Sequence, residues 1–259
     1  MNKFFFIFDK NKKAQFLKKK FLKRFKNSPI QKSKAIIVCG GDGFMLSNIR
    51  KFYKYKKPFY GINCGTYGFL LNNYKGLDIE KKIFKAKKSI ISPLKIIAKY
   101  SKNKTKSLIA INEISLFRQS RQTAIINLKI KSKNIIKRLV GDGVLICTPA
   151  GSTAYNLSVN GPILSLNSGK LGVTPISPFR PRRWSGKIVS DKYKIKVNNL
   201  NYDNKRPVAA VADNVEIRNI KNLSIQMNKK IKIDILFDRN RSLTKRIKLE
   251  QLRRNTSNF

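Results

Sequence analysis

The chain has 259 residues, a hydrophobic content of 41%, and 16 Phe and 9 Tyr side chains. This length and composition suit one large or two modest folded domains and exclude a disordered chain. The formal net charge is +44 and there is no histidine, so catalytic triads, general bases and metal sites that depend on histidine are excluded.

The first part of the chain predicts alternating strands and helices. Strands are expected at residues 3–8, 35–39 and 58–63, and helices at 12–26, 44–55 and 79–88. The helix at 12–26 carries Ala14, Leu17, Phe21 and Phe25 at helical spacing among lysines. The strand AIIVC is wholly apolar, as in a parallel sheet covered on both faces. This order predicts a Rossmann-like α/β domain, whose ligands bind at the carboxyl ends of the strands.

From residue 93 onward the pattern becomes β-rich. Seven segments favour strands, namely 93–100, 107–118, 123–132, 143–149, 192–199, 207–219 and 223–237. They predict a sandwich-like β domain. A short helix is expected over Ala154 to Ser158, capped by Ser152 or Thr153, and a basic helix over 242–254. The predicted domains are 1–92 and 93–238, and the tail 239–259 is expected to pack back on the first.

The chain shows no signal for membrane insertion or for a disulfide framework. No apolar run approaches the roughly 20 residues of a membrane-spanning helix, and the N-terminal FFFIF is too short for a signal peptide. Cys39, Cys64 and Cys147 are far apart, which favours neither disulfides nor a zinc site. The expected compartment is therefore a reducing cytoplasm.

The stretch AIIVCGGDGFML, residues 35–46, joins a strand to a helix through three glycines and an aspartate. Such a turn presents backbone N–H groups to an anion, so Gly40, Gly41 and Gly43 predict a loop for a phosphate donor. A plain tight turn is the alternative, and the Walker pattern is missing. Asp42 near a substrate hydroxyl could accept its proton during phosphoryl transfer, a step worth about 10² to 10⁴ in rate.

Three other places carry polar groups in apolar surroundings, and each has a simpler explanation. Asp142 in VGDGVLI could mark a hairpin turn. Asn112 and Glu113 interrupt an apolar strand, where at least one needs a partner unless the strand lies at a solvated edge. TPAGSTAYNLS, at 148–158, offers hydroxyls, free N–H groups and an aromatic ring suited to a nucleotide, or it is an ordinary capped helix.

Taken together, four blocks resemble the NAD kinases. They are GGDG at 40–43, GTYGFL at 65–70, NE at 112–113 and GDGVLICTPAGSTAYNLSVNGPIL at 141–164. GGDG alone is shared with diacylglycerol, sphingosine and 6-phosphofructokinase-type kinases, whereas the long fourth block is much more specific. TPISPFRPRRW, at 174–184, is similar to the version seen in alphaproteobacterial members.

The resemblance implies transfer of a phosphoryl group to the 2′-hydroxyl of the adenosine ribose of NAD, giving NADP, in a cleft between the two domains. Asp42 matches the proton acceptor, and Asp142 matches an acid that contacts nicotinamide or adenine, often from a neighbouring subunit. The other residues that match the binding pocket are Gly43, Phe69, Asn112, Glu113, Ala150, Thr153, Ala154, Tyr155, Asn156, Leu157, Ser158, Thr174 and Ile176.

Two positions depart from the family pattern. Many members carry a basic residue where this chain has Val140, and a hydroxyl residue where it has Ala150. The resemblance implies a homo-oligomer, a dimer or a tetramer. No cluster of carboxylates predicts a metal cage, so Mg²⁺ is expected to arrive bound to the donor phosphates.

Two other functions remain alternatives at this stage. A lipid kinase could use the same GGDG turn, although no membrane-docking apolar stripe is present. A nucleic-acid-binding protein would explain the charge. However, basic residues occur along nearly the whole chain, as expected of a compositional bias, and there is no zinc-finger or RNP-type motif. The sequence does not distinguish ATP from polyphosphate as donor, or NAD from NADH as acceptor.

Overall fold

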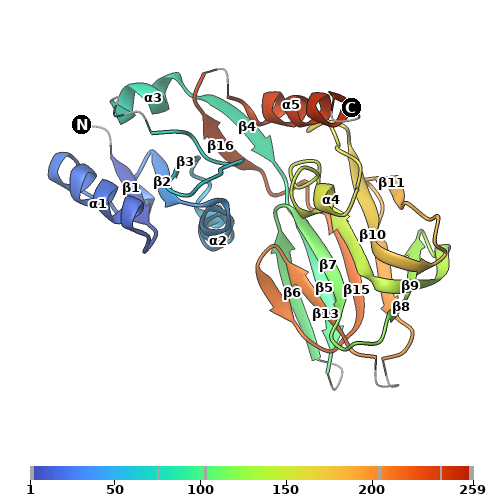
Figure 1. The fold of residues 1–259 in the computed structure, drawn as a ribbon. Coiled ribbons are helices and arrows are strands. Elements are labelled where there is room, and N and C mark those ends of the chain that lie inside the picture. The colour runs from blue at the N-terminus through green and yellow to red at the C-terminus, as the bar shows by residue number, and fades with distance from the viewer. Residues whose placement is uncertain are drawn as a thin grey trace. The chain divides into compact units, whose positions relative to one another are not determined.

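A computed structural model describes residues 3–74, 76, 78–101, 104–202, 206–239 and 241–256, the last four without their side chains. The chain forms two compact units (Figure 1). The first consists of residues 1–91 and 232–259, and the second of residues 92–231. No helix in the described ranges is long and apolar enough to span a membrane.

The first unit contains a five-stranded sheet in the order β1-β2-β3-β16-β4. Neighbouring strands are parallel except β16 and β4, which are antiparallel. The strands are β1 (Phe4–Phe8), β2 (Ala35–Gly40), β3 (Phe59–Asn63), β4 (Lys87–Ile91) and β16 (Ile233–Phe237). The predicted α/β fold is therefore confirmed, with one antiparallel edge strand added.

Helices cover both faces of this sheet. The helices are α1 (Lys12–Arg24), α2 (Asp42–Phe52), α3 (Ile79–Lys85) and α5 (Leu243–Thr256), with short 3-10 turns at Ile30–Lys32 and Tyr53–Tyr55. The apolar face of α1, which includes Leu17 and Phe21, packs with Ile37 of β2. Phe52 of α2 meets Phe5, which alternates with the α1-facing residues of β1. Helix α2 therefore lies on the opposite face, as in a doubly wound sheet.

The second unit contains one 11-stranded antiparallel sheet. Nine strands follow the path β14-β13-β7-β9-β8-β12-β15-β5-β6, while β10 pairs with β9 and β11. The bounds are β5 (Leu94–Tyr100), β6 (Lys104–Ala110), β7 (Glu113–Arg118), β8 (Ala124–Ile130), β9 (Lys133–Cys147), β10 (Lys170–Arg180), β11 (Lys187–Ser190), β12 (Ile195–Asn199), β13 (Val208–Ala212), β14 (Val215–Ile217) and β15 (Ile220–Met227). Residues from both ends of the path share one core, so the sheet curls on itself. The predicted β-rich class is confirmed.

Three sequence-based predictions differ from the structure. The segment 223–237 is split, because β15 pairs inside the second sheet while β16 joins the first, so the second unit ends at Ile231 and not at 238. The segment 107–118 is also split, and Asn112 lies in the bend between β6 and β7. Asp142 lies inside β9, so the hairpin alternative is wrong.

Candidate active site

Asp42 is the first residue of α2, and only Gly41 separates it from the carboxyl end of β2. The N–H groups of Phe69 and Leu70 donate to its two carboxylate oxygens at 2.6 and 2.9 Å. These amides belong to the loop that follows β3, which is the parallel neighbour of β2. Because the carboxyl ends of the two strands are adjacent, Asp42 contacts Phe69 and Leu70, which follow it by 27 and 28 positions in the sequence.

The environment of Asp42 favours a carboxylate that can take up a proton. Burial raises the pKa of Asp42, while the Phe69 and Leu70 amides and the charge of Arg246 partly lower it again. A carboxylate with a raised pKa is a stronger base than one in water. Both oxygens keep a lone pair beyond the amide bonds, so the side chain can still accept a substrate proton.

The three glycines around Asp42 play different parts. A Cβ at Gly40 would lie 2.5 Å from the ring of Phe44, so Gly40 is needed for packing. A Cβ at Gly41 or Gly43 would meet no atom within 4 Å. The space beside Asp42 is thus open at both positions, and the missing side chains leave room for a ligand at the start of α2.

The loop that donates to Asp42 also borders a cavity. Phe69 is half-buried, and the cavity, of about 560 Å³, lies between this loop and α5 within the first unit. It is lined by Asn63, Thr66, Tyr67, Gly68, Phe69, Asn73, Arg241, Lys245, Arg246, Leu249 and Glu250.

In the second unit, the predicted Asn-Glu pair and the TPAGST segment come together. The N–H of Thr148 donates to the carbonyl of Asn112 at 2.8 Å, and its hydroxyl donates to the carbonyl of Ile111 at 2.8 Å. A Cβ at Gly151 would overlap the backbone of Asn112. The glycine in this motif is therefore required by the close approach of two backbone segments.

Several polar atoms in this region are buried without a partner. Among the described residues, the buried side-chain oxygens without a hydrogen bond include one each of Asn112, Glu113 and Thr153. Such an atom is costly to bury unless a ligand or water satisfies it. All three residues were predicted from the sequence as substrate contacts, and these oxygens are available to a hydrogen-bond donor of a ligand or of water.

The environment of Glu113 favours the protonated form of its carboxyl group. Its side chain is buried, and desolvation together with the charge of Asp213 raises its pKa to about 8. Asp213 itself accepts hydrogen bonds from the N–H groups of Ile111 and Asn112 at 2.9 and 2.8 Å. It therefore fixes the backbone that carries the Asn-Glu pair.

Asp142 and Tyr155 lie on the outer part of the same unit. Asp142 is half-exposed and pairs with Arg118 of β7 at 2.5 Å. The ring of Tyr155 lies 5.8 Å from that of Phe117. Many family members carry a basic residue two positions before this acid, where this chain has Val140. Here Arg118 places a basic group beside Asp142 from a neighbouring strand.

The remaining predicted residues surround the helix α4 (Tyr155–Ser158). Asn156 is fully buried, donates to the carbonyls of Ser152 and Pro162, and accepts from the hydroxyl of Thr174 at 2.7 Å. The side chains of Asn156 and Thr174 therefore satisfy part of each other's hydrogen-bonding capacity. Of the others, Ala150 and Ile176 are buried, Ala154 and Leu157 are half-buried, and Ser158 is exposed.

The predicted cap of α4 is wrong. The residue before α4 is Ala154, and no side chain caps the helix. The hydroxyl of Ser152 instead donates to the carbonyl of Pro149 and accepts from the N–H of Leu164. Ser152 therefore closes the loop that follows β9.

Sequence reasoning missed three residues of these sites, namely Arg118, Asp213 and Arg246. Asp213 could have been found by the scarcity of acids, since it is one of 13 and ends an apolar run. Arg118 and Arg246 had no such signal, because the chain holds 57 Lys and Arg residues. In the described ranges no group of three His, Cys, Asp or Glu side chains could hold a metal ion.

Two solved structures share this fold. A yeast NADH kinase complexed with NADH superposes with a TM-score of 0.73 at 24% identity, covering 90% of this chain and 71% of that one. An NAD kinase from Archaeoglobus fulgidus in complex with ATP gives 0.71 at 21% identity, covering 95% and 98%. This chain therefore has the fold of these two kinases, an α/β unit joined to a curled antiparallel sheet.

Sequence comparison then identifies the family. Residues 111–237 match the model of the ATP-NAD kinase C-terminal domain. The NAD kinase of Zymomonas mobilis is 42% identical over 93% of this chain and 94% of its own length, and that of Brucella suis is 40% identical over 96% of both. The chain belongs to the NAD kinase family.

Proposed function

We propose that Asp42 is the general base in the phosphorylation of NAD at the 2′-hydroxyl of its adenosine ribose. As a member of its family, the protein converts NAD to NADP with ATP as donor. The observation that supports the proposal is the Asp42 carboxylate itself. This carboxylate lies at the start of α2 and accepts hydrogen bonds from the N–H groups of Phe69 and Leu70. The space at Gly41 and Gly43 beside it is open.

In the proposed reaction the 2′-hydroxyl gives its proton to Asp42 as its oxygen bonds to the γ-phosphorus of ATP. The bond between that phosphorus and the bridging oxygen breaks, and ADP leaves with the electron pair. ATP enters as its Mg²⁺ complex, which neutralises charge on the transferred group. The N–H groups at the start of α2 and the positive end of its dipole suit an anion at Gly41 and Gly43.

In the second unit, the residues assigned to NAD are those with unsatisfied oxygens. Asn112, Glu113 and Thr153 are proposed to hydrogen-bond the adenosine part, because their buried oxygens lack partners among the described residues. The aromatic pair of Phe117 and Tyr155 offers a surface for a flat ring.

Three further assignments belong to the proposal. We infer a homo-oligomer, and a reducing, cytoplasmic location. Cys39, Cys64 and Cys147 are buried and free, which fits such a location. Inorganic polyphosphate as a second donor and NADH as a second acceptor are open to the same assay.

The test is NADP formation by Asp42→Asn, measured with purified protein, Mg²⁺, NAD and ATP. We expect kcat to fall by at least about 10²-fold, because an amide cannot take up the proton. The Kd for NAD should stay within about threefold of that of the parent protein. In the parent, kcat should rise with pH as Asp42 loses its proton, and this dependence should vanish in the variant.

Asp234→Asn is the matched control. Asp234 is a partly exposed carboxylate of the same unit that pairs with Lys88 on the edge strand. The control should keep the turnover of the parent protein. Near-normal turnover of Asp42→Asn would refute the base assignment. Parallel reactions with polyphosphate and with NADH determine the range of donors and acceptors.

A further inference from the structure

Arg246 of α5 contacts the loop that carries the two amides bound to Asp42. Its Nη1 donates to the carbonyls of Gly68 and Phe69, both at 2.6 Å, and its Nη2 donates to the carbonyl of Leu71 at 2.7 Å. Three short bonds to three carbonyls use the planar fork of a guanidinium, which a lysine ammonium does not reproduce.

The same two peptide units are held by Arg246 and by Asp42. The peptide between Gly68 and Phe69 accepts from Arg246 at its oxygen and donates to Asp42 from its nitrogen. The peptide between Phe69 and Leu70 does the same. Because the C=O and N–H of a trans peptide point in opposite directions, the guanidinium and the carboxylate lie on opposite sides of these planar groups.

Hydrogen bonding at both ends of a peptide strengthens each bond, because the group becomes more polarised. Arg246 therefore acts on Asp42 through two rigid units. Its own position is fixed by three carbonyls, and it is half-buried. A displacement of the loop would move both amides away from the carboxylate at once.

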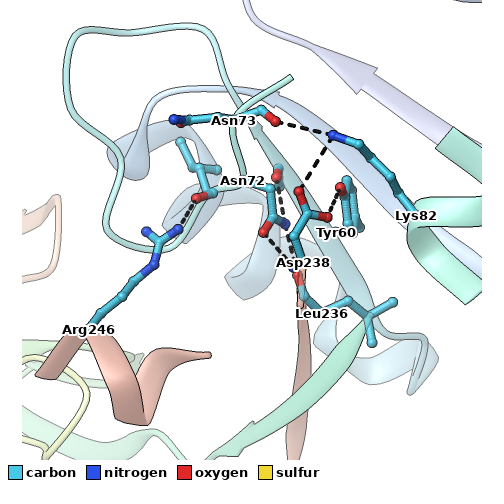
Figure 2. Close-up of polar contacts among 9 residues, drawn as sticks. Tyr60, Asn72, Asn73, Lys82, Leu236, Asp238 and Arg246 are labelled. Atoms are coloured by element: carbon cyan, nitrogen blue, oxygen red, sulfur yellow. Dashed lines mark hydrogen bonds and ion pairs between the residues drawn. The ribbon is translucent and has the colours of Figure 1, made fainter. Parts of the chain in front are cut away.

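The far end of this loop is fastened independently of Arg246 (Figure 2). Asn72 is buried and donates to the carbonyls of Gly61 and Leu236 at 3.1 and 3.0 Å. Its side-chain oxygen accepts from the N–H of Asp238 at 2.9 Å. In Figure 2, Arg246 approaches from α5 while Asn72 and Asp238 lie on the sheet side. Loss of Arg246 should therefore loosen the 68–71 segment without releasing the whole loop.

We propose that Arg246 is a positioning residue for phosphoryl transfer, which holds the Asp42 carboxylate in place through the peptide units 68–69 and 69–70. The inference rests on the proposed role of Asp42 as the base. It adds a residue from the C-terminal helix, 177 positions away from Phe69, to the machinery of the reaction.

The charge of Arg246 also acts on the acidity of Asp42. Arg246 and the two amides each lower the pKa of Asp42 against the larger effect of burial. The charged groups that act on Arg246 are Arg241, Asp42 and Asp238, and burial lowers the pKa of its guanidinium most. Removing Arg246 should therefore raise the pKa of Asp42 and shift the acidic limb of the kcat profile to higher pH.

The experiment compares Arg246→Gln and Arg246→Lys with the parent protein. We expect Arg246→Gln to lower kcat by about 10- to 100-fold, with KM for NAD within about threefold and the acidic limb moved to higher pH. Arg246→Lys keeps the charge but not the fork, so it should show a smaller pH shift and an intermediate kcat. Thermal unfolding of each variant confirms that the protein assayed is folded.

Lys248→Gln is the matched control, because Lys248 is an exposed cation on the same helix. It should leave kcat and the pH profile unchanged. Folded Arg246→Gln and Arg246→Lys proteins with parental kcat and pH profile would overturn the inference. An equal loss in Lys248→Gln would also overturn it, since a general effect of α5 charge would then explain the result.

Asp42→Asn assayed in parallel separates the two proposals. If Asp42→Asn is inactive while the Arg246 variants behave like the parent, the base assignment stands and the positioning role fails. If Asp42→Asn is active, the base assignment fails, and the positioning role fails with it.

Discussion

Glu113 should make the stability of the second unit fall as pH rises. Its pKa moves from an ordinary value of 4.5 to about 8 on folding, because burial and Asp213 disfavour the charged form. Between these two values the folded state binds more protons than the unfolded state, so the free energy of unfolding decreases with pH. The stabilising effect of the protonated form is complete below pH 4.5 and is lost through pH 8.

The magnitude follows from the same interval. Each pH unit inside it corresponds to about 1.4 kcal/mol, so the loss between pH 5 and 7 is roughly 2 to 3 kcal/mol. Over the whole interval it approaches about 5 kcal/mol. Glu113→Gln removes the titration while keeping the size of the side chain. As pH rises from 5 to 8, the free energy of unfolding of the parent protein should therefore fall relative to that of Glu113→Gln.

The assay is urea unfolding from pH 5 to 9, followed by the fluorescence of Trp184. This is the single tryptophan of the chain and packs against the core of the second unit. Glu216→Gln is the control, since Glu216 is an exposed carboxylate of the same unit. Parallel pH profiles for the parent and Glu113→Gln would mean that Glu113 is charged in the folded protein at neutral pH, and the reasoning would fail.

Two further substitutions test the surroundings of the candidate site. Gly43→Ala should stabilise the protein by up to about 1 kcal/mol in thermal unfolding, because alanine favours a helix and its Cβ meets no atom. The same variant should lower kcat/KM for NADP formation at least tenfold, since the methyl group fills the space assigned to substrate; unchanged kinetics would contradict that assignment. Asp213→Asn should lower the pKa of Glu113, because the charge of Asp213 raises it. The stability loss in the urea assay should then end at a lower pH, and an unchanged end point would show that Asp213 does not act on Glu113.

The elements of the first unit could be predicted because their signals are local. Strand β2 is an uninterrupted apolar run, and α1 carries its buried residues at helical spacing. Strand β10 was not predicted, because Pro175 and Pro178 argue against a strand interior. It pairs with β9 through both residues, and the register shifts after Pro178.

Long-range pairing decided the features that the sequence did not settle. The segments that became β15 and β16 read alike as strands, and only their partners place them in different sheets. Likewise the bend at Asn112 was hidden in an apolar run. It exists because Asp213, about 100 residues later, accepts from the amides of Ile111 and Asn112.

The candidate site followed the same rule. Asp42 could be predicted as a site residue because the glycines on both sides of it indicate a loop for a phosphate donor. Its amide partners and Arg246 could not, since they lie on other elements. The sequence thus identified the group proposed for the chemistry, and the structure identified what holds it.

The pKa values of the buried acids Asp42 and Glu113 are determined by their local surroundings and not by the net charge of the chain. With 57 Lys and Arg against 13 acids, a charge effect alone would lower the pKa of every carboxylate. Yet the pKa values of Asp42 and Glu113 are raised, and burial is the largest cause for both. Exposed cations are screened by water and salt within about 10 Å. The basic surface can therefore attract anionic nucleotides over a distance, while the proton affinity of each buried acid is set by its immediate neighbours. Asp42 and Asp213 each accept hydrogen bonds from two successive amides, but of the two only Asp42 lies at a helix start beside open space, and this difference supports the proposal that Asp42 is the base.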